Sequence, residues 1–231
     1  MIAGVDGCKS GWIAGIETAD REVVIRVFET FANLIEDQDI ALVVIDVPIG
    51  LPERGDRGCD VEARRLLRER GSSVFPAPLR PMLRVAEYES SKRHAEACRI
   101  RREIEGKGCS KQLSAIMPKI SEVDKCMNPE VQKRVFEGHP EVSFAYMNNG
   151  KPLCSKHTRE GLEHRIRLLE AHFPTARIRL ANLAALKAQG DDVLDALACL
   201  WTARRLLSGD AKHHPIDPPR DKRGLRMEIN A

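Results

Sequence analysis

The sequence predicts an α/β protein in which a central mixed β-sheet is flanked by helices. The first observation is that residues 1–46 are rich in β-branched segments separated by turn signals. The second is the apolar run IALVVID at residues 40–46, which is typical of a strand buried on both faces. A strand of this kind requires a layer of helices above and below the sheet.

Four segments share a strand pattern: residues 2–5, 12–16, 22–28 and 40–46. The dipeptide Asp6-Gly7 is a turn signal, so a hairpin-like loop is expected between Asp6 and Gly11. A further short strand that turns at Gly138 is expected within residues 135–144.

Helices are expected at about residues 60–70, 116–127, 158–173 and 191–207, and within residues 82–111. Three prolines keep Ser72–Pro81 out of regular structure. We therefore expect one domain, residues 1–209, with a helical insertion at about 71–134. Residues 210–231 have the composition of a C-terminal tail or an extended edge segment.

The composition favours a globular protein over a disordered or fibrous one. Of the 231 residues, 42% are hydrophobic, 31% are charged and 4% are aromatic. The net charge of +3 neither requires nor excludes a polyanionic partner, so a nucleic-acid surface would have to be local. The apolar run Ile40 to Ile45 is far shorter than the roughly 20 residues of a membrane helix, and the N-terminus lacks signal-peptide features. We expect a cytoplasmic protein without membrane contact.

The seven cysteines form no C-x-x-C pair and no zinc-ligand spacing with the histidines. We therefore expect reduced thiols.

The last predicted helix carries the most informative acids. From Val193 to Ala203 its one charged residue is Asp195, so the helix is expected to be buried. At 100° per residue, Asp192 and Asp195 share a face that otherwise consists of small residues. Asp191 and Asp192 also suit a first helical turn, where acids complement the helix dipole. Asp195 lies too far along the helix for that role, and two acids on one packed face favour a divalent cation between them.

Asp6 and Asp46 each follow an apolar strand, and ligands of open α/β sheets bind at such strand ends. Each alone is more often a turn or cap residue. Together with Asp192 and Asp195 they form a set of oxygen ligands that suits Mg²⁺ or Mn²⁺. His139 and Glu141 follow another short strand and are candidates for a further ligand or a general base.

Six polar residues are expected in loops or at helix starts, where they are candidates for contact with a phosphate or a base. They are Ser72, Ser73, Lys111, Gln112, Lys119 and Lys156. Each of them taken singly is also compatible with an ordinary surface position.

Six ordered motifs carry a family resemblance: GVDGCKSGW (4–12), VVIDVPIGLP (43–52), CDVEAR (59–64), SSVFPAP (72–78), HPEVSF (139–144) and GDDVLDALA (190–198). The chain resembles domain-of-unknown-function family 429, described as predicted nucleases of the ribonuclease H-like fold. The resemblance covers residues 2 to about 205.

Within that superfamily the chain is similar to the Holliday-junction resolvases, which carry an Asp after the first strand, an acid at the end of the fourth and D-x-x-D-A-L-A on the last helix. The resemblance implies that Asp6, Asp46, Asp192 and Asp195 have these roles. The chain departs from the resolvases in the Asp on the fourth strand, where they have Glu, and in the insertion at 71–134.

The resemblance implies a metal-dependent nuclease that hydrolyses nucleic-acid phosphodiester bonds by a two-metal mechanism. One alternative is nucleotide binding or phosphoryl transfer of the actin and sugar-kinase type, because Asp6 to Ser10 resembles their first phosphate hairpin. The absence of a repeat in the sequence argues against that alternative. A non-catalytic binding module is the other alternative.

Overall fold

The computed structural model describes residues 1–174 and 190–231, and a five-stranded mixed sheet lies at its centre. The strands are β1 (Ile2–Cys8), β2 (Gly11–Glu17), β3 (Val23–Phe28), β4 (Leu42–Ile45) and β5 (Val135–Glu137). They lie in the order β3-β2-β1-β4-β5. Strand β2 is antiparallel to β1 and β3, whereas β4 is parallel to β1 and β5. The prediction of an α/β protein with a mixed sheet is confirmed.

The first hairpin is tighter than expected. The pairing of β1 with β2 continues to Cys8 and Gly11, so only two residues remain in the turn. Gly11 has φ +130°, and a Cβ there would lie 2.1 Å from the carbonyl oxygen of Phe28. Asp6 therefore lies inside the hairpin ladder rather than in a loop. The parallel pairing of β1 with β4, however, ends at Val5.

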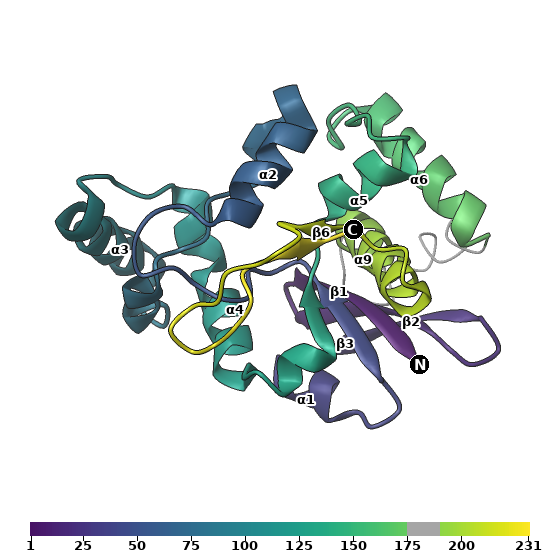
Figure 1. Ribbon diagram of the computed structural model, residues 1–231, viewed down its shortest axis with the longest axis horizontal. Helices are drawn as coiled ribbons and strands as arrows, with labels where there is room; N and C mark the ends of the chain where they lie inside the picture. The colour runs from purple at the N-terminus through teal and green to yellow at the C-terminus, as the bar shows by residue number, and fades with distance from the viewer. Residues whose placement is uncertain (175–189) are drawn as a thin grey trace.

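Helices cover both faces of the sheet, as the buried fourth strand requires. One face packs against α1 (Phe31–Glu36) and α4 (Lys111–Cys126). The other packs against α9 (Gly190–Ser208), which is flanked by α5 (Pro140–Met147) and α6 (Arg159–His172). Figure 1 shows α9 across the sheet, with α5 and α6 beyond it.

Helix α9 approaches β1 unusually closely. A Cβ on Gly4 would lie 1.9 Å from the Leu200 backbone nitrogen and 2.2 Å from the Ala196 carbonyl oxygen. Only glycine fits at this position, because the helix backbone occupies the space that a Cβ would need. The helix can come so close because it presents the small residues Ala196 and Cys199 to the strand. The sequence predicts this small-residue face, and the contact fixes α9 directly on the strand backbone.

The region of the predicted insertion contains two long helices. After α2 (Gly58–Leu67) come two 3₁₀ segments, Arg68–Ser73 and Arg80–Val85, and then α3 (Ser90–Glu105) and α4. Helix α4 begins earlier than expected, because the Ser110 hydroxyl accepts the Leu113 N–H as an N-cap. In Figure 1, α3 lies at the edge of the molecule and α4 lies between it and the sheet.

The predicted strand within residues 135–144 is shorter in the structure. Strand β5 ends at Glu137, and α5 begins at Pro140, where a proline is well suited to the first helical turn. Residues 135–144 are therefore strand followed by helix.

Residues 210–231 form an edge segment rather than a solvated tail. They contain β6 (His213–His214) and β7 (Ile229–Asn230), and Asn230 pairs with Gly138 beyond the end of β5. The Asn230 amide donates to the Glu137 carbonyl (2.9 Å), and Leu225 is buried. The few apolar residues of this basic segment anchor it to the protein.

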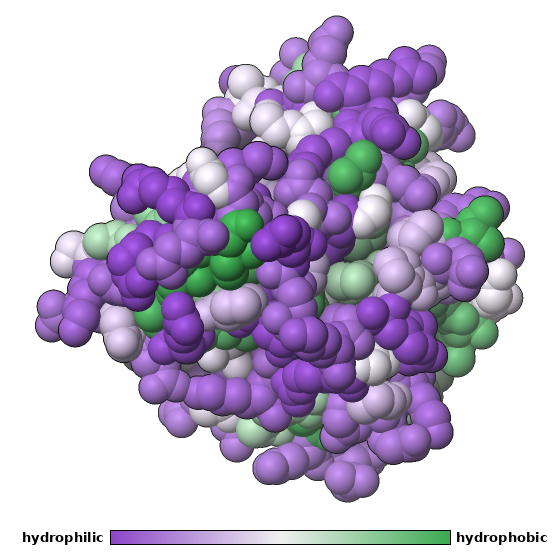
Figure 2. Space-filling model, turned by 60° about the vertical axis from the view of Figure 1, so that its left-hand side comes forward, coloured by the Kyte–Doolittle hydropathy of each residue, from purple (hydrophilic) through white to green (hydrophobic). Residues whose placement is uncertain are grey.

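Among residues 1–174 and 190–231, no helix combines the length and apolar character needed to cross a bilayer. The face shown in Figure 2 is mostly hydrophilic, and its apolar side chains form separate patches.

Candidate functional site

The parallel pairing of β1, β4 and β5 ends at one edge of the sheet, where Asp6, Asp46 and His139 follow the last paired residues. The Asp46 N–H donates to the carbonyl of Val5 in β1 at 3.0 Å. The Gly138 N–H donates to the last carbonyl of β4, also at 3.0 Å. These bonds continue the strand pairing by one residue, so Asp46 lies between Asp6 and the start of α5.

Helix α9 adds two more carboxylates to this edge. Gly4 and Asp6 face the same side of β1, because side chains alternate along a strand. Gly4 contacts α9 at Ala196, so Asp6 lies about one turn nearer the start of the helix, where Asp192 and Asp195 are. Both of these acids raise the pKa of Asp6 by charge repulsion, after the larger effect of burial.

Lys156 supplies a cation to this group of acids. It lies in the segment between α5 and α6, and its Nζ donates to Asp195 Oδ2 at 2.6 Å. The same Nζ lies 3.6 Å from Asp191 Oδ2. The expected phosphate-binding lysine is therefore ion-paired with a member of the acidic cluster, which we define as Asp6, Asp46 and Asp195.

Negative charge exceeds positive charge in the acidic cluster. Burial raises the pKa of all three carboxyls, and the pKa of Asp195 reaches about 7 although Lys156 lowers it. Burial alone would lower the pKa of Lys156, yet Asp195 and the neighbouring acids raise it above its usual value. The pKa shift of Asp195 therefore comes first from burial, whereas that of Lys156 comes from the several carboxylates that its ammonium group faces.

The acidic cluster opens on a cavity of about 650 Å³. Cationic or polar walls come from Arg70, Lys119 and Gln112, and apolar walls come from Phe75 and Ile116. All five belong to the segment around the predicted insertion, which therefore forms one side of the cavity. A volume in this range is typical of sites that enclose a small ligand or part of a larger one.

Most of the predicted site residues line this cavity: Asp6, Asp46, Asp195, His139, Glu141, Ser72, Ser73, Gln112, Lys119 and Lys156. Lys111 and Asp192 are not part of the lining. Lys111 is exposed at the start of α4. Asp192 contributes to the site through its charge on Asp6.

Two of the lining residues already have partners within the protein. Glu141 accepts two hydrogen bonds from Nη2 of the fully buried Arg165, at 2.6 and 2.7 Å. Lys119 donates to the Gly11 carbonyl at 2.5 Å and lies 4.3 Å from the Trp12 ring centroid. The charge of Glu141 is thus balanced by Arg165, which makes Glu141 a weaker candidate for a general base than His139.

The floor of the cavity contains a buried charge network that the sequence analysis did not assign. Arg57 donates to both carboxylate oxygens of Glu137, at 2.7 and 2.6 Å, and to Asp60. All three side chains are buried. Asp60 also accepts the Ala77 N–H, which ties the loop after Ser73 to α2. The three-residue spacing of Arg57 and Asp60 at a helix start is the sequence signal that indicates this pair.

The donor set fits a hard divalent cation. Carboxylate oxygens are the ligands that Mg²⁺ and Mn²⁺ prefer, and a cation would relieve the repulsion within the acidic cluster. The Nδ1 atom of His139 is buried and has no hydrogen-bond partner among the described residues. An unpaired buried ring nitrogen beside Asp46 is a further polar group for an ion or its bound water.

Asp195→Asn is expected to stabilise the metal-free protein at pH 8. The pKa of Asp195 is about 7 in the folded protein against 3.8 in the unfolded chain, so stability is lost as the pH rises between these values. Removing the charge should raise the free energy of unfolding by about 1 to 3 kcal/mol at pH 8, and by less at pH 5. Urea denaturation in the presence of a chelator measures both values.

Asp191→Asn is the matched control, because Asp191 contacts the same lysine but its side chain is 36% exposed. Its expected effect is below about 1 kcal/mol at both pH values. A loss of stability for Asp195→Asn at pH 8 would show that its pairing with Lys156 outweighs the repulsion.

The fold and the site together define an α/β protein with an acid-lined cavity at the carboxyl edge of its sheet. Residues 4–220 match the profile of a family described as "Protein of unknown function (DUF429)". The chain belongs to this family. No curated protein and no solved structure matches the chain.

Proposed function

We propose that the protein is a metal-dependent nuclease with a ribonuclease H-like fold, which hydrolyses phosphodiester bonds of nucleic acid. The mixed five-stranded sheet flanked by helices is compatible with that fold. The observation that carries the proposal is the convergence of Asp6, Asp46 and Asp195, from two parallel strands and one buried helix, on one cavity. Their excess negative charge favours binding of Mg²⁺ or Mn²⁺.

In this proposal each part of the cavity has a role in phosphodiester hydrolysis. Asp6, Asp46 and Asp195 would hold the metal, with Asp192 contributing charge. The chemistry that Mg²⁺ or Mn²⁺ would supply there is activation of a water and stabilisation of the leaving oxygen. His139 Nδ1 accepts a hydrogen bond from the attacking water, and Arg70 and Lys119 attract the phosphate backbone.

The second candidate is binding or phosphoryl transfer of a free nucleotide. The observation that favours it is the cavity volume of about 650 Å³, which suits a single nucleotide better than a duplex. If the protein is a nuclease, the same volume favours a particular kind of substrate: the end of a nucleic-acid strand, or a single-stranded segment, that enters the cavity between Phe75 and the acidic cluster.

The experiment offers the full chain single-stranded DNA, duplex DNA, RNA and nucleoside triphosphates, with Mn²⁺ or with a chelator. The nuclease proposal predicts Mn²⁺-dependent shortening of a polynucleotide that weakens as salt increases. Turnover of triphosphates alone would favour the phosphotransferase candidate. Manganese binding without turnover of any of these substrates would contradict both and favour a binding module.

A further inference from the structure

A second group of metal-ligating side chains lies in the insertion, separate from the acidic cluster. It consists of His94, Cys98 and Cys109, which we call the thiol cluster, and its potential ligand atoms all lie within 4.8 Å of one another. The Cys98 and Cys109 Sγ atoms are 3.3 Å apart. The His94 ring nitrogens lie 3.8 and 4.0 Å from Cys98 Sγ, and Nδ1 lies 3.9 Å from Cys109 Sγ.

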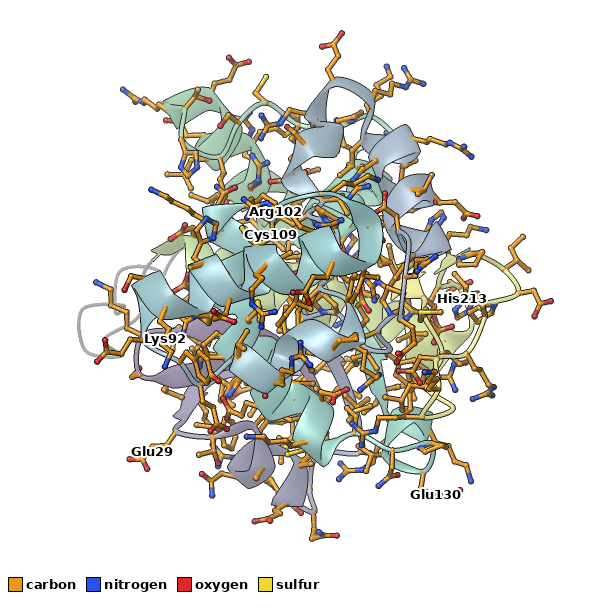
Figure 3. All side chains as sticks on the ribbon, turned by 90° about the vertical axis from the view of Figure 1, so that its left-hand side faces the viewer. Glu29, Lys92, Arg102, Cys109, Glu130 and His213 are labelled. Atoms are coloured by element: carbon orange, nitrogen blue, oxygen red, sulfur yellow. The ribbon has the colours of Figure 1, made fainter. Side chains whose placement is uncertain are left out.

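Local structure explains why these residues meet although their spacing in the sequence is irregular. His94 and Cys98 are four residues apart on α3, so they occupy the same face of the helix. Helix α3 ends at Gly106, whose φ of +72° turns the chain back along the helix. The Cys109 N–H then donates to Cys98 Sγ at 3.3 Å, which fixes the returning segment. Figure 3 shows Cys109 beside α3 on the side that faces the viewer.

The distances are closer to those of a metal site than to those of a disulfide. A tetrahedral ion with metal–sulfur bonds of about 2.3 Å and metal–nitrogen bonds of about 2.0 Å holds its ligand atoms about 3.5 to 3.8 Å apart. The observed separations differ from that range by a few tenths of an ångström. A disulfide requires an S–S distance of about 2.05 Å, well below the separation of Cys98 and Cys109.

We propose that His94, Cys98 and Cys109 bind a thiophilic metal ion of the Zn²⁺ class. Thiolate and imidazole ligands favour such an ion over the Mg²⁺ or Mn²⁺ that suits the acidic cluster. Three protein ligands leave a fourth position for water, and the partial exposure of Cys109 gives access to it. Binding releases the two thiol protons to solvent, and the two thiolates and the ion form a neutral unit.

The surroundings of Cys109 disfavour its thiolate form when no metal ion is bound. Burial and the neighbouring Cys98 raise the pKa of the Cys109 thiol to about 12, although Arg101 and Arg102 lower it. Without an ion the Cys109 thiol therefore stays protonated at neutral pH. A bound ion would join α3 to the segment that precedes α4, and α4 carries Gln112, Ile116 and Lys119 to the cavity.

Cobalt(II) is the probe for this site, because thiolate ligands give it intense charge-transfer absorption that carboxylate ligands do not. The full chain is reduced completely and titrated with Co²⁺, and Zn²⁺ is then added as a competitor. We expect one equivalent with thiolate absorption, displacement of that band by Zn²⁺, and a rise in melting temperature with Zn²⁺.

Cys109→Ser is expected to remove the thiolate band or weaken Co²⁺ binding by more than about 100-fold. The matched control is Cys126→Ser, another partly buried cysteine of the same region that lies outside the cluster. Should Cys109→Ser fail to fold, His94→Gln, which alters a partly exposed ligand, tests the same site.

Asp6→Asn distinguishes binding at the thiol cluster from binding at the acidic cluster. This variant should leave the thiolate band unchanged. The proposal is overturned if the reduced chain gives no thiolate band, or if the band persists in both Cys109→Ser and His94→Gln. The purified protein can carry a Cys98–Cys109 disulfide before it is reduced. Even then, the proposal is overturned if the reduced chain binds no Co²⁺.

Discussion

Asp6→Asn is expected to abolish Mn²⁺ binding at the acidic cluster and, with it, the proposed hydrolysis. Asp6 is the carboxylate whose pKa is raised by burial and then by Asp46, Asp195 and Asp192 together, so it lies at the centre of the negative charge. Changes to residues that only support a metal ligand typically cost about 10- to 100-fold in affinity or activity, so loss of a direct ligand should exceed 100-fold. Calorimetric titration with Mn²⁺ measures the effect without a substrate.

The fold of Asp6→Asn should remain intact. Asp6 Oδ1 accepts the Gly7 N–H at 2.7 Å, and an asparagine oxygen can accept the same bond. Asp20→Asn, which changes an exposed aspartate between β2 and β3, is the matched control and should bind Mn²⁺ as the parent does. Equal Mn²⁺ affinity in Asp6→Asn and the parent would refute the site.

Arg57→Met is expected to cost about 3 to 5 kcal/mol of stability at pH 8. The substitution retains much of the side-chain volume but leaves Glu137 and Asp60 buried without their cation. Burial raises the pKa of Glu137 to about 7 even though Arg57 lowers it, so loss of Arg57 raises it further. The carboxyl must then be protonated for the protein to fold, and the loss of stability should be smaller at pH 5 than at pH 8. Urea denaturation at both pH values measures it.

Arg99→Met is the matched control for Arg57→Met. Arg99 also bridges two glutamates, Glu96 and Glu103, but its side chain is 52% exposed on α3. Solvent screens such pairs, so the expected loss is below about 1 kcal/mol. Similar losses for the two variants would mean that the network beneath the cavity contributes no more than a surface ion pair.

The sequence predicts the parts of the fold that depend on local periodicity. The apolar run at residues 40–46 identifies the buried strand β4, and the apolar character of Val193–Ala203 identifies α9 as a buried helix. The small-residue face of α9 is predicted as well, and the structure shows that this face packs closely on β1. These features are encoded within single elements, where burial and side-chain spacing are visible in a short window.

Interactions between distant segments could not be predicted in this way. Lys156 reaches Asp195 from the segment before α6, and Glu137 reaches Arg57 across 80 residues. The thiol cluster forms because Gly106 reverses the chain, which brings Cys109 to a helix face that its sequence spacing does not indicate. Each pairing depends on the tertiary arrangement of loops, for which neither periodicity nor spacing provides a signal.

The contact between Gly4 and α9 has a consequence for the metal site that we propose. Because the helix touches the strand at main-chain atoms, the distance from Asp6 to Asp195 is limited by backbone positions that cannot move apart without opening the core. Carboxylates whose backbone positions are fixed in this way adapt poorly to a large ion. Mg²⁺ binds oxygen at about 2.0 to 2.1 Å and Ca²⁺ at about 2.3 to 2.6 Å. At the metal site that we propose, the missing side chain at Gly4 would therefore favour the smaller ion, although Gly4 itself offers no ligand.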